Sequence, residues 1–287
     1  MPLRDYSGVK TILITGCSAK SIGSALAMAL AQRGHHIFAT ARSPEKIPNT
    51  LTSLDNVTPL QLDVTSPTSV SDAVKAVQES SRGLDILVNN AGIGYTMPLL
   101  DAKLDEARNV YETNVWGVLR VVQGFSDLLI AARGKIVNVS TVGAVVNTPW
   151  IGIYSSSKSA LNQLSETLRL ELFPFGVSVI CLMVGTVQTS FHANEPPAVI
   201  TTESRYTVIR ETISRWSCGE AGPRGCSIEQ AAEKIIRDVL GSRGGIVWRG
   251  PNSAAIRFLA AWCPRWLLDR IMSKEQGLDE LEKSLAE

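Results

Sequence analysis

Short apolar runs alternate with longer amphipathic segments through the first 190 residues, and this rhythm constrains the fold more than any other feature. The apolar runs are rich in Val, Ile and Leu, as strands buried on both faces of a sheet are. The predicted strands are Val9–Thr15, His36–Ala41, Val57–Leu62, Ile86–Asn89, Lys135–Ser140, Ser178–Met183 and Gly245–Arg249. Such runs, separated by helices, predict a parallel sheet of about seven strands with helices on both faces, the doubly wound α/β class.

The segments between these runs predict the covering helices. They are Ile22–Gln32, Pro67–Ser81, one or two helices within Asp105–Ala132, Tyr154–Phe173 and Ile228–Gly241. After the sixth strand the rhythm breaks, because 190–225 is irregular and 254–287 is an apolar tail. No repeat or linker divides the chain, so we expect a single domain over 1–287.

Composition excludes several classes of function. The formal net charge is +1 and no basic tract occurs, so no nucleic-acid partner is expected. Five scattered cysteines and three histidines form no metal-binding spacing, which predicts no metal and a reducing, cytoplasmic location. The N-terminus, Met1–Tyr6, lacks the apolar stretch of a signal peptide, and no apolar run of about eighteen residues predicts a spanning helix.

Tyr154 and Lys158 stand four residues apart in a predicted helix, so both side chains share one face. A free phenol has a pKa of about 10, and an adjacent ammonium lowers it toward neutrality. The pair could therefore protonate a carbonyl oxygen or deprotonate an alcohol. A Tyr and a Lys on the surface of an ordinary helix would show the same spacing. The pair therefore indicates catalysis only if a nucleotide-binding site lies upstream in the sequence.

The turn after the first strand predicts such a site. Gly16 permits a tight turn and Gly23 permits close helix packing, although the middle glycine of G-x-G-x-x-G is missing. The helix that begins at Ile22 would offer N–H groups to a pyrophosphate. An ordinary strand-to-helix turn is the alternative. The candidate cofactor residues of this loop are Gly16, Ser18, Lys20, Ser21, Ile22 and Gly23.

The end of the second strand predicts the type of nicotinamide cofactor. It reads Thr40-Ala41-Arg42 and lacks the acidic residue that would bind the ribose 2′-hydroxyl of NAD. Arg42 could instead pair with a 2′-phosphate, assisted by Ser18 and Lys20, or it could be a solvated loop residue. The missing acid and the arginine together favour NADPH/NADP+.

Two more strand ends carry polar or small residues. Asp63-Val64 closes the third strand and Asn90-Ala91-Gly92 closes the fourth, at the edge where doubly wound sheets bind ligands. Asp63 could accept from an adenine amino group, and Ala91 and Gly92 would leave room for the cofactor. The composition of the second segment also fits a plain turn.

These motifs together resemble the short-chain dehydrogenase/reductase family from Thr11 to about Thr189. Asn114 within Thr113–Gly117, the Tyr154-Lys158 pair and Gly185-x-Val-x-Thr189 complete the ordered set. Phe38–Arg42, Leu99–Asp101 and Cys263–Arg270 are similar to a fungal branch of NADPH-dependent 1-acyldihydroxyacetone-phosphate reductases.

The resemblance implies a catalytic tetrad of Asn114, Thr141, Tyr154 and Lys158. Asn114 would hold a helix and a water, Lys158 would bind the nicotinamide ribose and lower the pKa of the phenol, and Tyr154 would be the acid–base. The family normally has Ser at the position of Thr141. Neighbouring strand residues face opposite ways, so Ser140 serves instead if the register is shifted by one.

The resemblance also implies that Gly185, Val187 and Thr189 bind the cofactor, with Val187 at the carboxamide and Thr189 near the pyrophosphate. Lys20-Ser21 and Val184-Gly185 depart from the family's usual residues. Both segments are expected to keep a backbone donor available to the cofactor.

The implied function is NADPH-dependent reduction of a ketone on a bulky, apolar substrate, lipid-like or from secondary metabolism. The substrate loop 190–225, the segment 143–152 and the tail 254–287, read as a lid, would supply Val145, Val146, Trp150, Ile151, Phe191, Tyr206, Trp216 and Trp262. A cofactor-binding scaffold with a regulatory or non-redox role is the alternative, favoured only by Thr141.

The expected partners are a small ketone or alcohol and further copies of the chain. A homodimer or homotetramer would form through the helices of Asp105–Ala132 and Tyr154–Phe173, as the family commonly does. Docking of the tail on a lipid surface is the weaker alternative to the lid.

Overall fold

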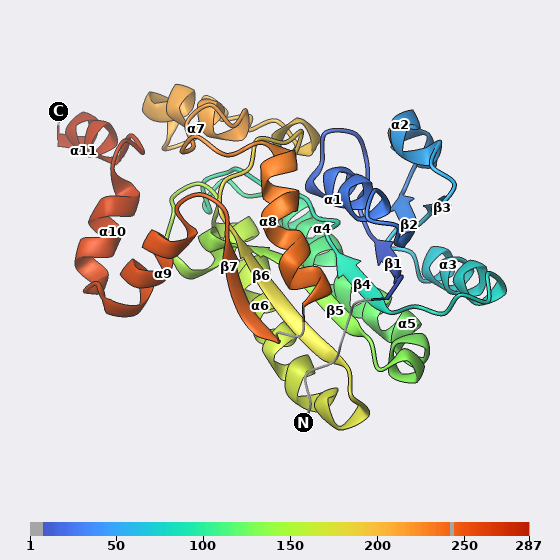
Figure 1. The fold of residues 1–287 in the computed structure, drawn as a ribbon. Coiled ribbons are helices and arrows are strands. Elements are labelled where there is room, and N and C mark those ends of the chain that lie inside the picture. The colour runs from blue at the N-terminus through green and yellow to red at the C-terminus, as the bar shows by residue number, and fades with distance from the viewer. Residues whose placement is uncertain (1–7, 242–243, 287) are drawn as a thin grey trace.

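The computed structural model describes residues 8–241 and 244–286; the N-terminal segment, where no signal peptide is expected, lies outside them. Within these ranges seven parallel strands form one sheet in the order β3-β2-β1-β4-β5-β6-β7 (Figure 1). They are β1 (Thr11–Ile14), β2 (His36–Ala41), β3 (Val57–Gln61), β4 (Ile86–Asn89), β5 (Lys135–Thr141), β6 (Ser178–Val184) and β7 (Gly245–Arg249). The predicted doubly wound α/β class is confirmed, and the strand order reverses between β1 and β4.

The strands are buried on both faces, as their apolar runs predicted. Ile12 and Ile14 of β1 join one core cluster and Leu13 joins the other, which is the two-residue alternation of a strand between two helix layers. β3 and β7 differ because they lie at the two edges of the sheet, and Ile246 of β7 is 45% exposed. β3 carries Pro59, which an edge strand tolerates because one side of the strand makes no hydrogen bonds to a neighbouring strand.

Helices cover both faces of the sheet, and core packing assigns them to layers. α1 (Ile22–Ala31) and α8 (Ile228–Leu240) supply the first core cluster. α3 (Pro67–Glu79), α5 (Val118–Ala132) and α6 (Gly152–Glu171) supply the second. A short helix, α2 (Asn49–Thr52), adds Leu51 to the first cluster.

The segment predicted as one or two long helices is a single helical run with a π-helical interruption. α4 (Leu104–Tyr111) continues through a π-helical segment, Glu112–Gly117, into α5. By length and composition alone, Leu104–Ala132 could span a membrane, which the search for an unbroken apolar run did not anticipate. Its apolar character has another physical cause, because Phe125 and Leu129 are buried in the core.

The C-terminal part holds elements that the sequence analysis did not predict. α7 (Arg210–Ser217) lies within the irregular segment, and α11 (Leu278–Ala286) follows α9 (Ser253–Trp262) and α10 (Arg265–Ser273). Figure 1 shows these last three helices beyond the β7 edge of the sheet. Leu278 and Leu281 of α11 pack on a cluster formed by Trp150, Ile209 and Ile213.

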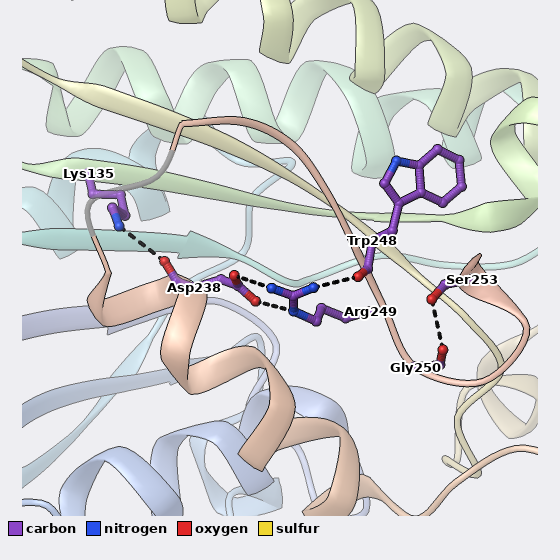
Figure 2. Close-up of polar contacts among 6 residues, drawn as sticks. All are labelled: Lys135, Asp238, Trp248, Arg249, Gly250 and Ser253. Carbon is purple, nitrogen blue, oxygen red and sulfur yellow. Dashed lines mark hydrogen bonds and ion pairs between the residues drawn. The ribbon is translucent and has the colours of Figure 1, made fainter. Parts of the chain in front are cut away.

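An ion pair ties α8 to β7 at this edge (Figure 2). Arg249 donates from Nε and Nη2 to the two carboxylate oxygens of Asp238, at 2.5 and 2.7 Å. The Asp238 side chain is 3% exposed and that of Arg249 is 31% exposed. Lys135 donates to the main-chain carbonyls of Asp238 and Gly241, where a cation offsets the dipole of the α8 C-terminus.

We expect Asp238→Ala to lower the free energy of unfolding by about 3 kcal/mol, the low end for breaking a buried pair, because Arg249 can still reach solvent. Urea unfolding measures the change. Glu233→Ala on the same helix is the control. Its partner is Arg33 and both side chains are well exposed, so the loss there should stay below about 1 kcal/mol. Equal losses of unfolding free energy in the two variants would contradict the assignment of Asp238 and Arg249 as a buried, stabilising ion pair.

Candidate active site

A cavity of about 1080 Å³ opens at the carboxyl ends of the strands, around the point where the strand order reverses. It is larger than most single-ligand sites, so it has room for a dinucleotide and a substrate. The predicted site residues in its lining are Gly16, Ser18, Ser21, Ile22, Arg42, Asp63, Val64, Asn90, Ala91, Gly92, Thr141, Tyr154, Lys158, Gly185, Val187 and Thr189. Lys20, Gly23 and Asn114 lie outside the lining.

The glycine loop is fastened to the end of β4 by hydrogen bonds. Thr15 Oγ1 accepts from the backbone N–H groups of Asn90 and Ala91, at 3.0 and 2.9 Å. The Asn90 side-chain amide donates to the carbonyls of Thr15 and Gly16. Asn90 therefore positions the loop with its side chain, and Thr15, which the sequence analysis did not single out, is its counterpart.

The two glycines of the loop are required by close approach. Gly16 has a φ of +73°, and a Cβ there would lie 2.9 Å from Ala91 Cα. A Cβ on Gly23 would lie 2.5 Å from both the Gly16 carbonyl oxygen and Asn90 Nδ2. Gly23 thus permits close packing behind the cavity wall and is not itself part of the lining. Lys20 has a left-handed φ of 58° in place of a glycine and lies outside the cavity lining.

The start of α1 lies at one end of the cavity. Ser21 caps the helix, accepting from the Ser24 N–H at 3.0 Å, while the Ser24 hydroxyl faces the Ser21 N–H in a capping box. The helix therefore begins at Ile22, as predicted, and its positive end borders the lining residues Ser18 and Ile22.

The end of β2 carries the positive charge expected for a 2′-phosphate. Arg42 is exposed at the cavity, and Ser43 and Lys46 line it beside Arg42. Glu45 also lines this end, so two cations face one carboxylate. Lys46 was missed because it follows in a short 3-10 turn, Pro44–Lys46, which no strand or helix pattern announces.

Asp63 is held by its own turn. Its Oδ1 accepts from the N–H and the hydroxyl of Thr65, at 2.9 and 2.8 Å. Next to it, Arg120 donates to the Val64 carbonyl at 2.7 Å, which fixes the end of β3 against α5. The carboxylate therefore keeps a fixed orientation at the cavity wall.

Tyr154 and Lys158 of α6 line the cavity, and Asn114 lies directly behind it. The Lys158 ammonium donates to the Val139 carbonyl at 2.9 Å. Asn114 is fully buried in the π-helical segment, where it exchanges two hydrogen bonds with the Ile93 backbone. A Cβ on Gly92 would lie 3.2 Å from Asn114 Oδ1 and 3.4 Å from Lys158 Nζ, so Gly92 separates the two groups closely.

The electrostatics of the pair differ from the expectation. Burial, and then the charge of Glu195, raise the pKa of the Tyr154 phenol above its usual value, and the Thr141 hydroxyl opposes this rise. Burial lowers the pKa of Lys158 to about 8. Lys158, which was expected to lower the pKa of the phenol, is not among the groups that shift it in this structure. Tyr154 is therefore a protonated acid at neutral pH.

Ser140 and Thr141 both line the cavity but have different neighbours. The Thr141 hydroxyl interacts with the Tyr154 phenol and accepts from the Gly143 N–H at 3.2 Å. The Ser140 hydroxyl is among the polar neighbours of the Cys181 thiol, whose pKa burial raises to about 11. This arrangement favours the register in which Thr141 faces the phenol.

Gly185 has a different role from the one expected. Its N–H donates to the Arg249 carbonyl at 2.8 Å, so that donor serves the sheet and not a cofactor. A Cβ on Gly185 would lie 1.8 Å from the Pro251 carbonyl oxygen, which explains the glycine. Val187 pairs with Cys226, and the Thr189 hydroxyl accepts from the Phe191 N–H at 3.1 Å.

The substrate end of the cavity is partly the predicted one. Ile151, Phe191 and Trp216 line it, and the Phe191 ring centroid lies 5.4 Å from that of Tyr154. The other residues expected there, which the lining lacks, are Val145, Val146, Trp150, Tyr206 and Trp262. Trp262 is 78% exposed, and the described part of the tail packs behind the substrate loop and contributes no residue to the lining.

The family model of the short chain dehydrogenases matches residues 10–199, more than half of the chain. The chain belongs to the short-chain dehydrogenase family. The short-chain dehydrogenase ptmH of Penicillium ochrochloron is 46% identical to it over 273 residues, which cover 94% of this chain and 98% of the relative.

One further relative and one solved structure are similar to this short-chain dehydrogenase. The NADPH-dependent 1-acyldihydroxyacetone phosphate reductase of Schizosaccharomyces pombe is 41% identical over 185 residues, 64% of this chain and 62% of the reductase, which confirms the resemblance to that branch. A short chain dehydrogenase from Burkholderia cenocepacia in complex with NADP has a TM-score of 0.75 and 24% identity, over 92% of this chain and 97% of the other. This likeness shows the shared fold.

A polar group at the substrate end of the dehydrogenase's cavity, formed by Thr96, His192 and Glu195, was also not anticipated. Glu195 is buried, and Thr96 Oγ1 donates to its Oε2 at 3.0 Å. They come from the loop after β4 and from the irregular segment after β6, which no local pattern relates. Only their contact in the folded chain reveals them.

We expect Thr141→Val to lower turnover about 10²–10³-fold, because it removes a hydroxyl beside the phenol while keeping the shape. Ser140→Ala should change turnover far less, because its hydroxyl neighbours Cys181 and not Tyr154. Steady-state kinetics with one ketone compares the two, and the Kd for NADPH should be nearly unchanged in both. The reverse order of effects would place the working hydroxyl on Ser140.

Proposed function

We propose that this dehydrogenase reduces a ketone with NADPH and that Tyr154 donates the proton. The observation that carries the proposal is the meeting of three groups in one cavity: the half-buried, protonated phenol of Tyr154, the Thr141 hydroxyl beside it, and the ammonium of Lys158. The family to which the chain belongs consists of dehydrogenases, and this chemistry agrees with the arrangement.

The residues present fit a dinucleotide. The glycine loop approaches β4 so closely that side chains at 16 and 23 would collide with it, which leaves a backbone-walled channel beside the positive end of α1. When bound, NADPH supplies the hydride. Gly92 keeps the wall open between this channel and Lys158.

The chain's own residues account for the proton. Tyr154 keeps its proton at neutral pH because burial and Glu195 raise its pKa, so it can hold a hydrogen bond to a carbonyl oxygen and release the proton once charge develops there. Thr141 supplies a second hydroxyl to the same oxygen. Lys158 and Asn114 hold the groups behind the phenol through Val139 and Ile93.

NADPH is favoured over NADH by the charge at the end of β2. Arg42 and Lys46 outnumber the single carboxylate of Glu45 there, and the strand itself ends without an acid. A guanidinium forms a charge-assisted fork with a phosphate, which the 2′-hydroxyl of NADH cannot offer. The reductase of Schizosaccharomyces pombe is NADPH-dependent by name, which supports the same preference.

A bulky substrate fits the remaining space. The substrate end is walled by Ile93, Ile151, Phe191 and Trp216, and apolar walls of this kind select apolar or aromatic bodies. We therefore place the substrate among bulky ketones of lipid-like or secondary-metabolite type.

The proposal is tested by NADPH oxidation with a panel of bulky ketones, followed by identification of the alcohols formed. Tyr154→Phe should reduce turnover at least as much as Thr141→Val, because it removes the proton donor. Tyr111→Phe is the matched control, since that exposed phenol hydrogen-bonds Ser156. A Tyr154→Phe enzyme with full activity would rule out the proposed chemistry.

We expect Arg42→Ala to weaken NADPH binding about tenfold or more and to leave NADH binding nearly unchanged, because hydrogen bonds to charged groups contribute about 1.5–3 kcal/mol. Lys46→Ala should act in the same direction with a smaller effect. Lys20→Ala serves as the control, because Lys20 lies outside the cavity lining. Fluorescence titration gives the Kd values, and equal Kd values for the two cofactors in the unmodified protein would refute the preference.

A further inference from the structure

The Glu195 carboxylate is buried at the substrate end of the cavity, and the proposed reaction uses it only through its effect on the pKa of Tyr154. Its side chain is 2% exposed, and it lines the same cavity as Tyr154. Burying an ionised carboxylate is expensive unless hydrogen bonds or charges compensate. Burial and, next, the charge of Glu195 raise the pKa of Tyr154, so the two groups are within electrostatic reach of each other.

The surroundings hold Glu195 in place. Thr96 donates to Oε2 at 3.0 Å, and Nδ1 of His192 lies 2.8 Å from Oε1. Gly94 makes the room, because a Cβ there would lie 2.1 Å from Glu195 Oε1 and 2.7 Å from Phe191 Cε1. A side chain at position 94 would therefore displace both the carboxylate and the ring that packs on Tyr154.

Hydrophobic packing secures the loop that carries Glu195. Ala198 and Ile200 pack against the cluster of Tyr95, Met97 and Val110. The carboxylate is thus fixed between the loop after β4 and the loop after β6. This arrangement keeps it at a constant position relative to the phenol.

Polar groups at this end have bonding capacity left over. A carboxylate offers about four acceptor sites, and among the described residues Thr96 donates to one of them. Nδ1 of His192 lies 2.8 Å from Oε1 but makes no hydrogen bond to a described residue. The buried indole N–H of Trp216, in the same lining, has no acceptor among the described residues. Buried polar groups are normally paired, so an acceptor and a donor of this kind indicate a ligand that completes them.

We propose that Glu195 binds a hydroxyl group that the substrate carries apart from its carbonyl, so that the substrate class is a bulky hydroxyketone. This inference rests on the proposed reductase function. A hydroxyl can donate to the carboxylate and accept from an N–H such as that of Trp216. An ammonium is the poorer fit, because the His192 imidazole already faces Oε1 and the other walls are apolar.

The test is isothermal titration calorimetry. The full chain is saturated with NADP+ and titrated separately with tetralone and with each of the monohydroxytetralones. At least one hydroxy isomer should bind about tenfold or more tightly than tetralone, since hydrogen bonds to charged groups contribute at least that much. Glu195→Gln keeps the shape and an acceptor for Thr96 but removes the charge. It should reduce this preference to below about threefold and leave the Kd of tetralone within about twofold.

Glu203→Gln is the matched control, because Glu203 is an exposed carboxylate on the same loop. It should keep the full preference. Glu195→Ala, checked for folding by thermal denaturation, should lose the preference at least as completely as Glu195→Gln.

Two outcomes would overturn the proposal. They are no preference for any hydroxy derivative in the unmodified protein, and a preference that survives Glu195→Gln. NADPH oxidation by the same ketones is followed in parallel. Absence of turnover would count against the reductase function, whereas the Kd ratios decide the role of Glu195.

Discussion

The contact between the glycine loop and the end of β4 is the constraint on which the rest of the site depends. Thr15 and Asn90 exchange hydrogen bonds across the point where neighbouring strands β1 and β4 lead to helices on opposite faces. Because Gly16 and Gly23 have no side chains, the loop can lie against Ala91 and Asn90. This close packing opens the α1 N-terminus to the cavity and aligns β4, whose continuation through Gly92 borders Lys158 and Asn114.

The acidity of the phenol depends on a second set of contacts, and these come from distant parts of the chain. Tyr154 is on α6, Thr141 ends β5 and Glu195 is on the loop after β6. Burial and Glu195 keep the proton on the phenol, while Thr141 opposes them. A phenol that keeps its proton fits the donor role that we propose for Tyr154.

The sequence predicted the strands and their class because each strand is a local, contiguous apolar run. The cofactor end was predictable for the same reason, since Gly16, Arg42 and Gly92 directly follow strands. Lys46, Thr96 and Glu195 were not, because only tertiary packing brings them to the cavity. Asn114 was identified by resemblance, but its π-helical setting leaves no mark in the hydrophobic pattern. Gly185 lines the cavity, but its N–H bonds to Arg249 and is therefore not the backbone donor that was expected for a cofactor.

The two ends of the cavity are therefore built by different physical means. The cofactor end is held by backbone hydrogen bonds at strand termini, where a change of one side chain disturbs the sheet. The substrate end is held by hydrophobic packing: Ile200 and Trp216 pack on the Trp150 cluster, and α11 supports that cluster from outside. Volume-conserving changes in such packing are tolerated, typically for less than about 1.5 kcal/mol. Apolar residues of the substrate end can accordingly be changed while the hydrogen bonds of the cofactor end stay in place.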